Sequence, residues 1–157
     1  MPVYLQLTEH FSLEEMTHSD IAARKGLDNT PTPEIIANLT RVAATMERVR
    51  VLLGWNAVHV HSGYRSVEVN KAVGGVATSA HCKGLACDFD VQTYSNYAAA
   101  MKIKESGIPF DQLILEFSGS PYGGWVHLGL AEDGKQPRMQ CLTKKTAASP
   151  YEPGLNP

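Results

Sequence analysis

One long stretch of helical periodicity constrains the fold of this chain more than any other feature. Thr32 and Pro33 supply an N-cap and a first-turn proline, and Gly54 ends the stretch. Between these signals, apolar residues recur at steps of three and four, namely Ile35, Leu39, Val42, Met46, Val49 and Leu53. The spacing predicts a long amphipathic helix over residues 33–53. We expect its apolar face to belong to the core rather than to a partner-binding surface.

Shorter helices are predicted on both sides of this one. Ser12 and Glu15 form a capping box ahead of a short helix, because each side chain can satisfy an orphan backbone donor of the other. Ser66 is placed to cap a helix that runs to Val73. A further helix is predicted from Ser95 to Ser106, where Gly107 and Pro109 follow.

Short alternating segments dominate the second half of the chain. They predict strands at residues 57–61, 86–91, 112–117, 125–130 and 138–143. Since helices come first and most strands later, the pattern favours an α+β fold with a small, largely antiparallel sheet. From Lys144 onward the periodicity is lost. We therefore predict one domain over residues 1–143 and an extended C-terminal tail over residues 144–157.

Length and charge exclude several classes of protein. A chain of 157 residues fits one domain, and 43% hydrophobic against 19% charged residues is a globular composition. The net charge of -2 gives no basic field for nucleic acid. The sequence contains no apolar run of about 18 residues, so it predicts no membrane-spanning helix. The first residues lack a secretory signal. We expect a monomer that is made in the cytoplasm and stays there unless another agent releases it.

Three residues form a candidate metal site. His81 and Asp88 are seven positions apart, which on a helix would separate them by about 10.5 Å, too far to share one ion. Gly84 between them allows the chain to turn back, so that a loop histidine and a strand aspartate can converge. The alternation of the strand at residues 125–130 places His127 on the face opposite the core, the kind of face predicted for Asp88.

The ligand count favours catalysis over a structural role. Two imidazoles and one carboxylate leave the fourth position of a tetrahedral Zn²⁺ ion for water. We therefore predict one zinc ion and metal-assisted hydrolysis.

Several motifs together resemble the M15 family of zinc D-Ala-D-Ala peptidases, most closely its small branch found in bacteriophages and prophages. The motifs are Ser62-Gly63-Tyr64-Arg65-Ser66 with Asn70, Val73-Gly74-Gly75, the pattern S-x-H-x-x-G-x-A-x-D from Ser79 to Asp88, and Trp125-Val126-His127. The resemblance covers residues 11–143. It implies a Hedgehog/DD-peptidase-like fold, in which N-terminal helices pack with a sheet that carries the zinc site.

The resemblance also implies roles for individual residues. Zinc is held by His81, Asp88 and His127, Arg65 binds a substrate carboxylate or the developing oxyanion, and Ser79 lies beside the metal and touches substrate. The implied substrate is the peptide stem of bacterial peptidoglycan. A phage or prophage lysis enzyme follows as the leading hypothesis. Such an enzyme would remain in the host cytoplasm until a holin-type pore admits it to the cell wall, and association with the virion is an alternative.

The chain departs from the family pattern at the general base. Some members have a glutamate three residues before the last zinc histidine, and that position is Gly124 here. Glu116, at the end of the preceding strand, is the nearest candidate, because a hairpin can bring it to the metal. A non-catalytic wall-binding or virion module braced by zinc is therefore the rival hypothesis.

Other residues near the motifs have two interpretations each. Tyr64 and Trp125 either line the substrate groove or pack. The bond that is cleaved is not specified and would depend on the loop at residues 118–124 and on Gly74-Gly75. The roles of three cysteines, Cys82, Cys87 and Cys141, are also not specified.

His59 and His61 share one face of a predicted strand. They are expected to be half-exposed strand residues rather than a second metal site, because no carboxylate or thiolate stands at a suitable offset. Asp90 shares the predicted face of Asp88, where it either orients a site histidine or is solvated at the sheet edge.

Overall fold

A computed structural model describes residues 5–118 and 123–157 of the chain. The chain forms two compact units. The first, here the helical unit, comprises Met1–Glu47 and Ser62–Cys87, and the second, the sheet unit, comprises Arg48–His61 and Asp88–Pro157. None of the helices in the described residues is both long and apolar enough to cross a membrane.

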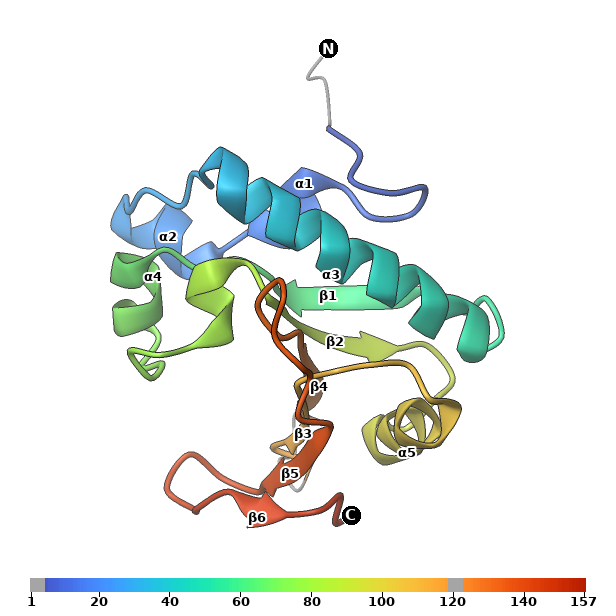
Figure 1. Ribbon diagram of the computed structural model, residues 1–157. Coiled ribbons are helices and arrows are strands. Elements are labelled where there is room, and N and C mark those ends of the chain that lie inside the picture. The colour runs from blue at the N-terminus through green and yellow to red at the C-terminus, as the bar shows by residue number, and fades with distance from the viewer. Residues whose placement is uncertain (1–4, 119–122) are drawn as a thin grey trace. The chain divides into compact units, whose positions relative to one another are not determined.

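The helical unit is built from short serine-capped segments and most of one long helix (Figure 1). Its elements are α1 (Leu13–Thr17), α2 (Asp20–Lys25), α3 (Pro33–Leu52, which runs on into the sheet unit), α4 (Val67–Ala72) and the 3₁₀ turn η1 (Ala80–Lys83). Serine stands at the N-cap of α1, α2, α4 and η1, and each hydroxyl accepts a hydrogen bond from a backbone N–H of the first turn.

The long helix was predicted correctly, and the apolar residues that repeat along it are buried except for Ile35, which is half-buried. Leu39, Val42, Met46, Val49 and Leu53 are fully buried. The helices that begin after Ser12, Ser66 and Ser95 are also confirmed, within a residue or two at their ends. Helix α2 and the turn η1 were not predicted, because segments this short carry too few apolar repeats to show a period.

The sheet unit carries most of a six-stranded sheet in the order β1-β2-β4-β3-β5-β6. The strands are β1 (Val58–Ser62), β2 (Ala86–Val91), β3 (Gln112–Glu116), β4 (Trp125–Gly129), β5 (Gln140–Lys144) and β6 (Glu152–Pro153). Strand β3 is antiparallel to β4 but parallel to β5. Strand β5 is antiparallel to β6, so the sheet is mixed and contains at least one parallel pair that the sequence did not predict.

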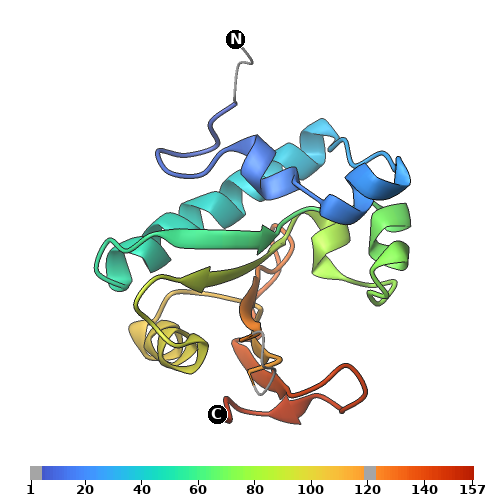
Figure 2. The same ribbon diagram turned by 180° about the vertical axis from the view of Figure 1, so that it is seen from behind.

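The two faces of the β3–β4 hairpin differ in character. The register pairs Leu113 with Leu128 and Leu115 with Val126, and all four are fully buried. Helix α5 (Asn96–Ser106) packs against these two strands, and Figure 2 shows it from behind. The other face carries Ile114 opposite His127 and Glu116 opposite Trp125. This second face, here the site face, holds the polar residues of interest.

The C-terminal segment is not the extended tail that the sequence predicted. Lys144 is the last residue of β5, and β6 returns to pair with that strand, as Figure 1 shows. The buried hydroxyl of Thr143 donates to the carbonyl of Gly154 at 2.8 Å and accepts from the backbone N–H of Asn156 at 2.9 Å. A buried polar side chain that needs both bonds therefore fixes the end of the chain.

Candidate functional site

A carboxylate and an imidazole meet on the site face of the sheet unit. Asp88 comes from β2 and His127 from β4, which are neighbours in the sheet. Their side chains hydrogen-bond, with 2.8 Å between His127 Nδ1 and Asp88 Oδ1. Both residues are buried: His127 is 7% exposed and Asp88 is 5% exposed. The alternation of each strand explains this meeting, since the residues on either side, Cys87 and Phe89 for Asp88, belong to the core.

A second carboxylate lies close to this pair. The register of the hairpin places Glu116 on the same face as His127, two positions along the sheet from it. Glu116 Oε1 is 3.9 Å from His127 Nδ1, and the Glu116 side chain is only 14% exposed. The sequence-predicted hairpin thus brings this glutamate to the histidine.

Two carboxylates and one imidazole in a largely buried cluster form a donor set suited to a cation. Placing two carboxylates near one another in a low-dielectric site is unfavourable unless positive charge or a shared proton compensates. A divalent ion that accepts nitrogen and oxygen ligands would supply that charge.

Tyr151 is a residue near this cluster that the sequence did not indicate. Burial raises the pKa of its phenol, and the charges of Glu116 and Asp88 raise it further. Its ring lies under the ammonium group of Lys144, with Nζ 4.6 Å from the ring centroid. No sequence signal pointed to Tyr151, because it falls in the segment interpreted as a tail.

His81 belongs to the helical unit, where backbone contacts fix its ring. It lies in η1 and is 2% exposed. Its Nδ1 is 2.6 Å from the carbonyl oxygen of Gly63 and donates to it in the tautomer that a metal ligand requires, which leaves Nε2 as the ligand atom. Ser79 caps the turn and accepts a hydrogen bond from the His81 backbone N–H at 3.2 Å. Ser79 thus holds the segment that carries the histidine.

Two glycines make this arrangement possible. Gly84 ends η1 with φ +68°, a left-handed conformation, and a Cβ there would press against Ile35. Gly63 packs so closely on Met16 that a Cβ would overlap the Met16 carbonyl oxygen. The next residue, Tyr64, donates its backbone N–H to that same oxygen at 2.7 Å. The Gly63 carbonyl, which accepts the hydrogen bond from the His81 ring, is therefore held in a fixed position against α1.

Arg65 lies in the same segment and has an unsatisfied donor. Its backbone N–H donates to the carbonyl of His81 at 3.1 Å. Its guanidinium Nε is buried and has no hydrogen-bond partner among the described residues. Burial raises the pKa of the neighbouring Cys82 thiol, and the positive charge of Arg65 opposes that rise. A buried guanidinium donor without a partner indicates a place for an anionic ligand group.

Tyr64 and Trp125 are placed differently from each other. Tyr64 is 8% exposed in the helical unit, and burial is the main cause that raises its pKa. Trp125 is half-buried in the sheet unit, packs on Phe117 with 4.9 Å between ring centroids, and has a buried Nε1 without a partner among the described residues. Of the loop at residues 118–124, residues 119–122 lie outside the described part.

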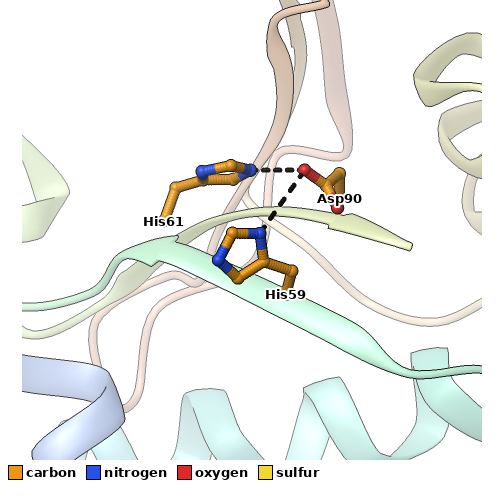
Figure 3. Close-up of side chains that lie close together, drawn as sticks. All are labelled: His59, His61 and Asp90. Atoms are coloured by element: carbon orange, nitrogen blue, oxygen red, sulfur yellow. Dashed lines mark hydrogen bonds and ion pairs between the residues drawn. The ribbon is translucent and has the colours of Figure 1, made fainter. Parts of the chain in front are cut away.

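The Asp90 carboxylate contacts His59 and His61 rather than the pair formed by Asp88 and His127. Its carboxylate Oδ2 lies 2.5 Å from Nε2 of His61 and 3.8 Å from Nδ1 of His59 (Figure 3). The expectation that no carboxylate stands near these two histidines is therefore wrong. It was wrong because offsets along one strand say nothing about the neighbouring strand.

The cysteines are free thiols. Cys87 is buried, while Cys82 and Cys141 are half-buried with thiol pKa values raised by burial. A raised pKa disfavours the thiolate, which is the form that attacks or binds metals.

Comparison with known proteins assigns a family. The family described as Peptidase M15 matches residues 9–128, which is most of the chain. The chain belongs to the M15 peptidase family, and membership implies a peptidase. No curated protein matches the chain.

Proposed function

We propose that this protein is a zinc metallopeptidase that hydrolyses peptide bonds of the peptidoglycan stem. The proposed ligands of one zinc ion are His81, Asp88 and His127. The observation that carries the proposal is the buried cluster in which Asp88 and His127 are 2.8 Å apart and Glu116 is 3.9 Å from the same nitrogen. The family match, which spans all the proposed ligands, supports it.

The paired residues fit the spacing that zinc requires. A tetrahedral ion with bonds of about 2.0–2.1 Å holds its ligand atoms roughly 3.3–3.4 Å apart. The hydrogen-bonded atoms of Asp88 and His127 therefore need to separate by only about half an ångström to receive the ion. When bound, zinc supplies a Lewis acid that polarises the scissile carbonyl and makes water nucleophilic at neutral pH.

Glu116 is the proposed general base. In this role its carboxylate takes a proton from the attacking water and then gives that proton to the departing amine. Its low exposure and its closeness to Asp88 and His127 support this role, because the base must lie within reach of the nucleophile.

Arg65 is the proposed binding group for a substrate carboxylate or for the developing oxyanion. The buried Nε without a partner supports this role, since a substrate anion would satisfy it. Ser79, Tyr64 and Trp125 are proposed to contact substrate, and Ser79 also positions His81.

The proposed biological role is host-cell lysis by a phage or prophage enzyme of the Hedgehog/DD-peptidase-like fold. It would act on the bacterial cell wall as a D-Ala-D-Ala carboxypeptidase or as a murein endopeptidase. The family match supports the peptidase activity that this role requires.

Digestion of purified cell walls tests the proposal. We expect new amino groups to appear with the zinc-loaded protein, to stop after a chelator removes the metal, and to return on addition of zinc. Mass spectrometry of the released muropeptides identifies the bond. Binding to the walls without new amino groups would overturn the proposal and favour the non-catalytic wall-binding module.

A further inference from the structure

Two histidines and an aspartate form a second cluster on the sheet unit. His59 and His61 lie on β1 and Asp90 lies on β2, and one donor atom from each lies within 4.8 Å of the others. Figure 3 shows both imidazole rings turned toward a single carboxylate oxygen, Asp90 Oδ2. The ring centroids of the two histidines are 4.5 Å apart.

The sequence explains why these side chains meet at the surface. His59 and His61 are two positions apart, so strand alternation points both to one face. Strand β1 is at the edge of the sheet, beside β2. The side chains are accessible to solvent, at 71% exposure for His59, 34% for His61 and 39% for Asp90.

A simple hydrogen bond accounts for only part of this geometry. The 2.5 Å contact between His61 Nε2 and Asp90 Oδ2 is a hydrogen bond. His59 makes no such bond to Asp90, because its Nδ1 is 3.8 Å away, yet this exposed ring points to the same oxygen. The His59 ring also contacts the His61 ring, so two imidazoles and one carboxylate are gathered into one compact set of donor atoms.

We propose that His59, His61 and Asp90 bind a second zinc ion. Two imidazole nitrogens and one carboxylate oxygen are the ligand types that zinc takes, and solvent would complete a tetrahedron. The separations of 2.5 and 3.8 Å bracket the roughly 3.3–3.4 Å between ligand atoms of a tetrahedral zinc ion. Rotation of the exposed side chains is enough to reach that spacing.

This site is separate from the proposed catalytic one. Asp88 and Asp90 are two positions apart on β2, a spacing of about 7 Å along a strand. Co-catalytic metal pairs lie only about 3.5–4 Å apart and share ligands. The second ion is therefore an accessory ion, and the exposure of its ligands makes it the more readily exchanged of the two.

Trp125 provides a reporter for this site once the proposed catalytic ion is removed, because Trp125 also shares the site face with His127. Its ring centroid is 6.4 Å from that of His61. The other tryptophan of the chain, Trp55, is 62% exposed and lies beside Arg50. In a Trp55→Phe, Asp88→Asn background, which should lose the proposed catalytic ion, Co²⁺ at the accessory site should quench the remaining fluorescence.

The test is a zinc titration of the full chain in competition with a chromophoric chelator, paired with Co²⁺ quenching. We expect two bound zinc ions per chain. His61→Gln and His59→Gln should each lower the affinity of the weaker site by at least ~100-fold. In the Trp55→Phe, Asp88→Asn background, each should also abolish Co²⁺ quenching at the concentrations that saturate the protein with both histidines intact. His18→Gln is the matched control, because His18 also pairs with an aspartate, Asp20, at 2.9 Å but belongs to no three-donor cluster in the described residues.

Removal of a proposed catalytic ligand separates the two proposals. Asp88→Asn should lose the tighter zinc ion and keep the one that His61→Gln removes. If the proposed catalytic site alone is wrong, the parent binds one ion, which His61→Gln abolishes. A parent that binds a single ion unaffected by His59→Gln and His61→Gln would overturn the accessory site.

Discussion

His127 Nδ1 and Asp88 Oδ1 lie 2.8 Å apart across two neighbouring strands, although 39 residues separate them in the sequence. Both side chains are buried, so this contact is protected from water. A metal ion bound between these two side chains would replace their hydrogen bond. The negative charge of Asp88 is therefore the first property to test.

Asp88→Asn should weaken zinc binding without a change in the size or shape of the side chain. The amide keeps an oxygen that can accept from His127 but loses the negative charge that favours a divalent ion. We expect zinc to bind at least ~100-fold more weakly, more than the ~10–100-fold typical of residues that only support a ligand. Competition titration measures the change, and the exposed Asp133→Asn is the control. Unchanged zinc affinity would exclude Asp88 as a ligand.

Glu116→Gln should separate chemistry from metal binding. The amide cannot accept the proton of the attacking water, so hydrolysis should fall by about 10²–10⁴-fold. The zinc content should stay the same, because Glu116 is proposed as a base and not as a ligand. Release of amino groups from cell walls and bound zinc are measured together, with the exposed Glu68→Gln as control. Loss of zinc along with activity would instead make Glu116 a ligand.

The elements of the fold could be predicted from the sequence where local signals were dense. The repeat from Ile35 to Leu53 spans many turns, and the alternation in β2 and β4 set the faces of Asp88 and His127. The parallel pairing of β3 with β5 could not be predicted, because strand partners depend on contacts that no local pattern encodes.

Residues of the candidate site could likewise be predicted only where a local sequence pattern marked them. Spacing and motif singled out Asp88, His127 and Glu116. Tyr151 was missed because its segment has no periodicity, and only the pairing of β6 with β5 brings that segment back. The cluster of Asp90 with His59 and His61 was missed because it depends on which strands are neighbours in the sheet.

Arg65→Lys should impair catalysis without loss of metal. Lysine keeps the positive charge but lacks the planar fork and the Nε donor that is buried in the native protein. We expect kcat/KM to fall by about 10²-fold, the size of effect seen when one donor to a developing oxyanion is removed. Steady-state kinetics with an isolated stem peptide measure this, with the exposed Arg48→Lys as control. Full activity in Arg65→Lys would show that charge alone suffices or that Arg65 has no role.

Gly63→Ala should disturb the support of His81. The added Cβ would overlap the carbonyl oxygen of Met16, which already accepts the backbone N–H of Tyr64. We expect the free energy of unfolding to fall by about 1–3 kcal/mol. We also expect zinc affinity to fall by ~10–100-fold, because the Gly63 carbonyl orients the His81 ring.

Gly134→Ala is the control for this substitution. Gly134 has φ +79° and open space around its Cβ position, so alanine there adds only backbone strain of about 1–2 kcal/mol. Urea denaturation and zinc titration are applied to both variants. Equal zinc affinity in the two would contradict the supporting role of Gly63.

Asp111→Asn should make the protein less stable at neutral pH but not at acid pH. Hydrogen bonds from the Arg138 guanidinium lower the pKa of Asp111, with Arg138 Nη2 at 2.7 Å from Oδ2. A carboxyl group whose pKa is lower in the folded state contributes stability above its unfolded pKa of about 3.9. That contribution is lost as the pH falls through the lower, folded value. The loss at pH 7 should be about 1 kcal/mol, since Arg138 is 58% exposed and solvent screens the pair.

Denaturation of the parent and of Asp111→Asn at a series of pH values checks this difference. The two curves of unfolding free energy should lie apart at pH 7 and converge as Asp111 becomes protonated in the parent. Asp133→Asn should follow the parent throughout. Asp111 also joins strands through its backbone, because it donates to Gly129 and accepts from Gln140. These bonds do not titrate, so an equal loss at pH 7 and at pH 2–3 would show that the ion pair with Arg138 does not stabilise the fold.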